Sequence, residues 1–155
     1  PHNTAGAYGC LKSHVNVVKD AKENNYESIL IFEDDVTFRD NFQEMAKKFF
    51  EEVPENWLSI FLGANFQGAP RSINESVAVG RAFGAQAFLL KSSLFDIIIQ
   101  WGDTVANAPI DVFYADQIQT RDTNYFAHPQ LCSQEPGKSD IENRDVDHRG
   151  VLGGF

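Results

Sequence analysis

The sequence predicts an α/β domain with a mixed, mainly parallel sheet flanked by helices. Apolar segments typical of strands alternate along the chain with segments in which apolar residues recur at three- and four-residue spacing, as on amphipathic helices. Such alternation is typical of β-α-β units. The chain has 155 residues, 43% of them hydrophobic, which suits one domain with a substantial core. We therefore expect a single domain over residues 1–155.

The N-terminal half carries the clearest elements. Leu11, His14 and Val18 share one face of a helix expected over residues 10–24. A strand is expected over Ser28–Phe32, buried on both faces because its residues do not alternate between polar and apolar. Asp40 followed by Gln43 resembles a capping box that opens a second helix, ending before Pro54.

The later elements are less regular but continue the alternation. We expect a strand over 57–63, a loop over 65–76 and a strand or hairpin within 78–91. A helix should run from Ser92 or Ser93 through Trp101, and Pro109 and Asp111 should open another. A short strand is expected within 124–132. After Gln134 the chain becomes polar, and residues 135–155 are expected to form an irregular tail.

Composition narrows the classes of partner. With 13 basic and 22 acidic residues the net charge is −9, which argues against binding to nucleic acid. Two cysteines, Cys10 and Cys132, are too few for a disulfide framework, which favours a reducing compartment. No apolar run is long enough to span a bilayer. We therefore expect a cytoplasmic protein, including one at the inner membrane surface.

Three consecutive acids, Glu33, Asp34 and Asp35, follow the strand Ser28–Phe32. Ligands of α/β sheets bind beyond the carboxyl ends of strands, and alternation predicts Glu33 and Asp35 on one side with Asp34 on the other. Carboxylates this close repel one another, and a divalent cation with oxygen ligands such as Mg²⁺ or Mn²⁺ removes that cost. Such an ion would hold a diphosphate. The alternative is that the acids are simply solvated where the strand ends.

Three blocks of the sequence resemble the glycosyltransferase family 25 pattern. The family includes bacterial lipooligosaccharide galactosyltransferases and collagen galactosyltransferase domains. The first block lies in "GAYGCLKSH", the second in "LIFEDDVTF" and the third in "HPQLCSQEPGKSDI". The positions that match the pattern are Gly9, Cys10, Ser13 and His14, then Glu33, Asp34 and Asp35, and finally Pro129, Gln134, Ser139, Asp140 and Ile141.

The resemblance implies a GT-A-like fold, a UDP-sugar donor and Mn²⁺ (or Mg²⁺) at the acidic motif. It also implies transfer of a hexose, galactose or glucose, to a saccharide or glycan acceptor or to a hydroxylated protein side chain. Members of the family normally begin with a further strand and helix. We therefore expect a GT-A-like fold that lacks the first strand-helix unit.

The resemblance also assigns roles to particular residues. Asp35 would be the direct metal ligand, with Glu33 beside it as a second metal residue. The residues expected to contact the donor are Gly9, Ser13, His14, Glu33, Asp34, Gln134, Ser139 and Asp140. From the residues alone, Ser13 is either helix surface or a phosphate contact near the first turn of its helix, where free N–H groups favour anions. By the same reasoning His14 is a hydrogen-bonded, half-buried histidine, and Cys10 is a small packed residue.

Two aspartates are candidates for the catalytic base. "PIDVF" resembles the family segment that places an acid in the acceptor pocket, so Asp111 is the first candidate and Asp116 the second. Such a base takes the proton of the acceptor hydroxyl as it attacks. Near the C-terminus, "RDVDHR" imitates a metal site through Asp145, Asp147 and His148, but a charged tail is the better interpretation.

The sequence thus predicts a metal-dependent hexosyltransferase. One rival hypothesis is a non-catalytic remnant of the same fold that binds carbohydrate or protein. Another is an unrelated metal-dependent phosphohydrolase built on the acidic cluster.

Overall fold

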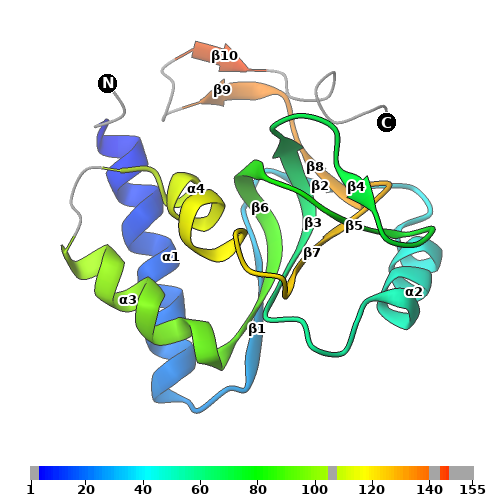
Figure 1. Ribbon diagram of the computed structural model, residues 1–155. Coiled ribbons are helices and arrows are strands. Elements are labelled where there is room, and N and C mark those ends of the chain that lie inside the picture. The colour runs from blue at the N-terminus through cyan, green and yellow to red at the C-terminus, as the bar shows by residue number, and fades with distance from the viewer. Residues whose placement is uncertain (1–3, 105–107, 140–143, 147–155) are drawn as a thin grey trace.

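The fold is built on one six-stranded sheet with helices on both faces (Figure 1). The computed structural model describes residues 4–104, 108–139 and 144–146. Within them the sheet has the strand order β1-β6-β3-β7-β5-β4. Its strands are β1 (Ser28–Phe32), β3 (Ser59–Phe66), β4 (Arg71–Ser72), β5 (Val77–Val79), β6 (Ala82–Lys91) and β7 (Asn124–Ala127). The α/β class predicted from the sequence is confirmed.

The sheet is mixed but mostly antiparallel, so the expected mainly parallel sheet is wrong. Strands β3 and β7 form the parallel pair, whereas β1–β6, β3–β6, β5–β7 and β4–β5 are antiparallel. The reason is the position of β6, which lies between β1 and β3 and runs against both. Strands β1, β3 and β7 therefore still point in one direction, and their carboxyl ends lie at the same edge of the sheet.

Helices and short strands cover the two faces. One face packs on α1 (Ala5–Glu23), α3 (Phe95–Thr104), α4 (Ile110–Phe113) and the π-helical turn η2 (Tyr114–Ile118), with the 3₁₀ turn η1 (Ser92–Leu94) before α3. The other face packs on α2 (Phe42–Glu52). A two-stranded sheet of β2 (Val36–Phe38) and β8 (Cys132–Gln134) lies near the second face. Each face has its own apolar core, so the sheet is the middle of three layers.

Helix α1 begins five residues before the predicted start. The Thr4 side chain accepts a hydrogen bond from the Ala7 N–H at 3.1 Å, which caps the first turn. Leu11, Val15 and Val18 are fully buried against the sheet and α3, at the spacing that the sequence shows. The first sequence block, residues 9–14, therefore lies inside a helix rather than at its start.

Strand β1 has the predicted bounds, but it is an edge strand and is not buried on both faces. Ile31 is buried toward α1, whereas Leu30 and Phe32 are 48% and 41% exposed on the opposite face. Phe32 packs edge-on against Phe38 of β2. The uniform apolar run of β1 therefore reflects one face packed on the core and one covered only in part.

Two further local expectations are wrong. Asn41, not Asp40, is the N-cap residue of α2, and it makes no side-chain capping bond, so the capping box is not formed. Strands β9 (Gly137–Ser139) and β10 (Arg144–Val146) pair antiparallel in the segment expected to be irregular.

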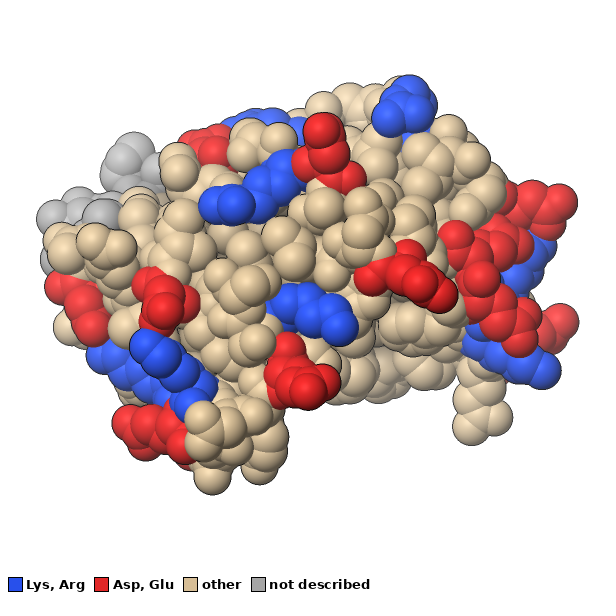
Figure 2. Space-filling model, turned by 60° about the horizontal axis from the view of Figure 1, so that its bottom comes forward, with Lys and Arg blue, Asp and Glu red and all other residues tan. Residues whose placement is uncertain are grey.

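The surface carries both signs of charge. Figure 2 shows Lys and Arg side chains scattered among Asp and Glu on one face of the molecule. Several of the described charges are paired across elements, as in Lys19–Asp103 and Lys22–Asp96 between α1 and α3. None of the helices in the described ranges combines the length and hydrophobicity that a bilayer-crossing segment requires.

Candidate functional site

Glu33 lies directly beyond the carboxyl end of β1, where the strand gives way to a tight turn. Its N–H donates to the Gln86 carbonyl oxygen of β6 at 2.9 Å, and its own carbonyl oxygen accepts from the Val36 N–H at 3.3 Å. Asp34 and Asp35 form the turn between β1 and β2, and both are exposed. Because both ends of its backbone are held, Glu33 presents its carboxylate in a fixed direction toward α1.

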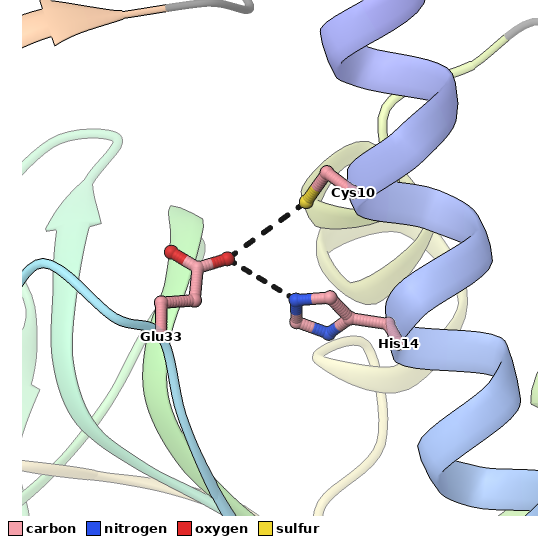
Figure 3. Close-up of side chains that lie close together, drawn as sticks. All are labelled: Cys10, His14 and Glu33. Carbon is pink, nitrogen blue, oxygen red and sulfur yellow. Dashed lines mark hydrogen bonds and ion pairs between the residues drawn. The ribbon is translucent and has the colours of Figure 1, made fainter.

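Two residues of α1 meet this carboxylate (Figure 3). His14 Nε2 lies 3.1 Å from Glu33 Oε1, and the Cys10 thiol donates to the same oxygen with Sγ at 3.9 Å. Cys10 and His14 are four residues apart, so they lie on one side of the helix. His14 is buried, and its ring stacks on Phe88 with 5.6 Å between centroids. The expected hydrogen bond of His14 is confirmed, and the side chain is more deeply buried than the half-buried position expected.

Gln134 brings the third sequence block to the same place. The antiparallel pairing of β2 with β8 sets Gln134 opposite Val36, directly after the acidic turn. Its Nε2 donates to Glu33 Oε2 at 3.3 Å and to Asp35 Oδ2 at 3.4 Å. The Glu135 N–H also donates to the Asp35 carbonyl oxygen at 2.8 Å. Glu33 and Asp35 therefore face the same amide, as their spacing predicts, while Glu33 alone reaches α1.

The residues that meet at Glu33, namely Cys10, His14, Asp35 and Gln134, are called the Glu33 cluster, and two of its groups have perturbed pKa values. Burial and the neighbouring Glu33 raise the pKa of Asp35 above its ordinary value, and the Gln134 hydrogen bond opposes the shift. Burial, with smaller contributions from Glu33 and Asp111, raises the pKa of the Cys10 thiol to about 12. Cys10 is thus a protonated thiol in the absence of other ligands, consistent with a packed residue rather than a free nucleophile.

The remaining residues of the first block do not reach the cluster. Ser13 is exposed in the third turn of α1, which agrees with the helix-surface alternative and does not place it at the free N–H groups of the first turn. Gly9 is also exposed within the helix, and a Cβ built there meets nothing within 4 Å. Their proposed contacts with a donor are untested by this geometry.

The two candidate bases lie in different surroundings. Asp111 accepts hydrogen bonds from the backbone N–H groups of Gly84 at 3.2 Å and Val112 at 2.8 Å, and it helps to raise the pKa of Cys10. Gly84 lies two residues before Gln86 on β6, and the Gln86 carbonyl oxygen accepts from the Glu33 N–H, so Asp111 and Glu33 are held by the same part of β6. Asp116 is exposed and pairs with Arg81 at the surface. As expected from their spacing, the two carboxylates do not share one face.

The structure describes part of the third block and part of the charged segment "RDVDHR". In the third block, Ser139 ends β9, whereas Asp140 and Ile141 lie outside the described residues. Asp147 and His148 of the charged segment also lie outside them. Asp145 is exposed in β10. Pro129 is exposed between β7 and β8, after a cis peptide bond.

Two buried polar residues near the cluster escaped the sequence analysis. Tyr114 is fully buried, and its hydroxyl has no hydrogen-bond partner within the described part of the chain. Gln86 is also fully buried, and neither amide atom has such a partner there. For Gln86 a signal existed, because it is the polar residue in the middle of the apolar strand "AFGAQAFLLK". Tyr114 has no comparable signal, since buried tyrosines are common.

The raised pKa of Asp35 predicts a pH-dependent stability effect. The folded protein favours the neutral form of the Asp35 carboxyl more than the unfolded chain does. The free energy of unfolding therefore falls as the pH rises from the unfolded-state pKa of Asp35 through its folded-state pKa. We expect Asp35→Asn to stabilise the protein at pH 7 by about 0.5 kcal/mol, because solvent screens an exposed group. The gain should vanish below the ordinary carboxyl pKa. Urea unfolding at pH 7 and pH 3 measures both values, and an equal gain at both pH values would contradict the prediction.

The fold and this geometry define an α/β protein with a cluster of acidic side chains at the carboxyl edge of its sheet. Residues 3–68 match the model of "Glycosyltransferase family 25 (LPS biosynthesis protein)". The predicted resemblance to this family is thus confirmed for residues 3–68, which are similar to its model. The match covers the first two sequence blocks but not the third.

Relatives carry names of two kinds. "Inactive glycosyltransferase 25 family member 3" of Mus musculus is 33% identical over 63 residues, 39% of this chain and 11% of that protein. "Procollagen galactosyltransferase 2" of Mus musculus is 33% identical over 63 residues, 39% of this chain and 10% of that protein. "Probable inactive glycosyltransferase 25 family member 3" of Bos taurus is 27% identical over 95 residues, 56% of this chain and 16% of that protein. The chain therefore spans about a tenth to a sixth of the length of these relatives.

Proposed function

We propose that this chain binds a UDP-linked hexose together with Mn²⁺ or Mg²⁺ and takes part in transferring the hexose to a saccharide or a hydroxylated protein side chain. The observation that carries the proposal is the convergence on Glu33. His14 from the first block and Gln134 from the third both contact this carboxylate of the second block. A partly buried carboxylate at which residues far apart in the sequence meet is typical of a binding site.

The acidic turn fits a hard divalent cation. Asp35 Oδ2 and Glu33 Oε2 both accept hydrogen bonds from the Gln134 amide, and burial together with repulsion from Glu33 raises the pKa of Asp35. A cation beside Asp35 would remove this repulsion, and the exposure of Asp34 and Asp35 leaves room for water and phosphate ligands. Asp35 is the better direct ligand, because Glu33 Oε1 is already engaged by His14 and Cys10. When bound, such an ion neutralises the charge of a departing nucleotide.

The protein's own groups would do the remaining work. Gln134 holds Glu33 and Asp35 on one side, and His14 fixes the other oxygen of Glu33. Asp111, held by the same part of β6 as the Glu33 cluster, is the first candidate to accept the proton of an attacking hydroxyl, because Asp116 is engaged by Arg81 at the surface. Two backbone N–H donors orient the Asp111 carboxylate.

A titration of the full chain with UDP, with and without Mn²⁺, tests the proposal. We expect UDP to bind more tightly by tenfold or more when Mn²⁺ is present, on the order of 1.4 kcal/mol. Asp35→Asn should remove this difference. Asp96→Asn is the matched control, because Asp96 is an exposed acid on α3 that pairs with Lys22. Manganese-independent binding in the wild type, or an unchanged manganese effect in Asp35→Asn, would overturn the metal role of Asp35.

A second candidate is a non-catalytic binding remnant, which the inactive relatives favour. Transfer of labelled hexose to a saccharide or to peptides with hydroxylated side chains separates the two. UDP binding without transfer supports the remnant, and transfer that requires Mn²⁺ supports the enzyme. Release of phosphate from simple esters without an acceptor would instead indicate the hydrolase.

A further inference from the structure

Cys10, His14 and Glu33 bring three different ligand atoms together on the side of the cluster that faces α1. Sγ, Nε2 and a carboxylate oxygen all lie within 4.8 Å of one another. Figure 3 shows the Cys10 and His14 side chains leaving neighbouring turns of α1 and pointing at the same oxygen of Glu33. These atoms lie on the opposite side of Glu33 from Asp35, which is joined to it through Gln134.

We propose that Cys10, His14 and Glu33 form a site for Zn²⁺ or a similar borderline transition metal, separate from the hard cation at Asp35. Sulfur and imidazole ligands select such ions over Mn²⁺ and Mg²⁺, which prefer oxygen. Three protein ligands leave a fourth tetrahedral position for water or another small ligand. The site goes beyond sugar transfer and does not require it.

Two of the three ligand–ligand distances are close to those around a tetrahedral ion. The third pair, Cys10 Sγ and His14 Nε2, lies within 4.8 Å and must approach by up to roughly 1 Å when an ion binds. Metal–ligand bonds of about 2.0 to 2.3 Å place neighbouring ligand atoms roughly 3.3 to 3.8 Å apart. The Nε2–Oε1 distance is 3.1 Å and the Sγ–Oε1 distance is 3.9 Å, so side-chain shifts of a few tenths of an ångström bring these pairs into range. Gln134 holds the second oxygen of Glu33, which is the outer support that metal-binding carboxylates usually have.

A buried polar group gives independent support. The Tyr114 hydroxyl is fully buried without a partner in the part of the chain that the structure describes. The Tyr114 ring packs beside the His14 ring, with 6.2 Å between the two centroids. A hydroxyl left without a partner in a buried site costs free energy unless a ligand or water meets it. A ligand in the fourth position of the metal could supply that partner.

Proton balance is simple at this site. Binding displaces the thiol proton of Cys10 to solvent, and the cation reverses the cost that burial and nearby acids place on the thiolate. As a ligand through Nε2, His14 would carry its ring proton on Nδ1, which is buried and makes no hydrogen bond within the described residues.

Titration of the full reduced chain with Co²⁺, the spectroscopic substitute for Zn²⁺, tests the site. We expect one equivalent to bind, with intense visible bands typical of tetrahedral cobalt and a near-ultraviolet thiolate-to-cobalt charge-transfer band, both removed by Zn²⁺. Cys10→Ser should abolish the charge-transfer band, while Cys132→Ser is the matched control because Cys132 is the other free cysteine and is buried elsewhere. His14→Gln should weaken cobalt binding by about tenfold or more.

Several outcomes would overturn the proposal. They are the lack of a charge-transfer band in the wild type, a band that survives in Cys10→Ser, or a band lost in Cys132→Ser. If Cys10→Ser does not fold by circular dichroism, His14→Gln and Glu33→Gln provide the test, and unchanged cobalt affinity in both rejects the site. Asp35→Asn separates this proposal from the first, because it should lose manganese-dependent UDP binding and keep the cobalt spectrum.

Discussion

Replacing Gly63 with alanine should destabilise the protein by about 3 kcal/mol or more, because the new methyl group meets backbone that cannot move aside. A Cβ at Gly63 would lie 2.3 Å from the Cys132 carbonyl oxygen and 2.9 Å from its carbonyl carbon. Both β-strands that meet here are held on their other sides. β3 pairs with β6, and β8 pairs with β2 through the Phe38–Cys132 register. The Leu131 N–H also donates to the Leu62 carbonyl oxygen at 2.8 Å.

Chemical denaturation of Gly63→Ala measures this loss as a lower midpoint. Gly9→Ala is the control, because a Cβ there meets nothing within 4 Å in the exposed face of α1. Alanine in that helix should be neutral or stabilising, by up to about 1 kcal/mol. Equal stability of Gly63→Ala and the wild type would show that β8 can withdraw from β3 without loss.

The Gly63 contact also bears on the site. If β8 shifts to relieve the clash, Gln134 at its end moves away from Glu33 and Asp35. We therefore expect any folded Gly63→Ala protein to bind UDP and Mn²⁺ more weakly than the wild type. The close approach at Gly63 thus connects core packing to the position of the acidic turn.

The direction of β1, β3 and β7 could be predicted from the sequence, but the arrangement of the sheet could not. Helix α2 between β1 and β3 predicts that those two strands run the same way, and they do. Nothing in the apolar run of β6 reveals that it inserts between them in the opposite direction. A buried strand has the same apolar pattern whichever way it runs, so strand order depends on tertiary pairing.

The site was predictable where the motifs are continuous. The acidic triplet and its place beyond β1 follow from the sequence, and so does the burial of His14. The role of Glu33 as the meeting point of α1 and β8 does not follow, because it depends on the pairing of β2 with β8. Likewise, the sequence places Ser13 near a helix start only because the cap at Thr4 lies seven residues before Leu11, the first residue of the clear apolar repeat.

Gly102→Ala should destabilise the contact between α3 and α1 by about 2 kcal/mol, even though alanine is the better helix former. A Cβ at Gly102 would lie 2.2 Å from Val15 Cγ2 and 3.3 Å from Val15 Cβ. Val15 is fully buried and β-branched, so its rotamer in a helix is nearly fixed. The Lys12 ammonium also donates to the Gly102 carbonyl oxygen at 2.9 Å, which holds the two helices at this separation.

A double-mutant cycle isolates the cause. Val15→Ala alone removes buried methyl groups and should cost about 2 kcal/mol, whereas in Val15→Ala/Gly102→Ala the new methyl group occupies the vacated space. The double variant should therefore be more stable than the sum of the single effects by at least ~1 kcal/mol in urea unfolding. Additive losses would show that Gly102 is required for another reason. His14 and Cys10 lie on the same helix as Val15, so a shift of this helix in Gly102→Ala should also weaken cobalt binding. The double variant should then recover cobalt binding together with stability.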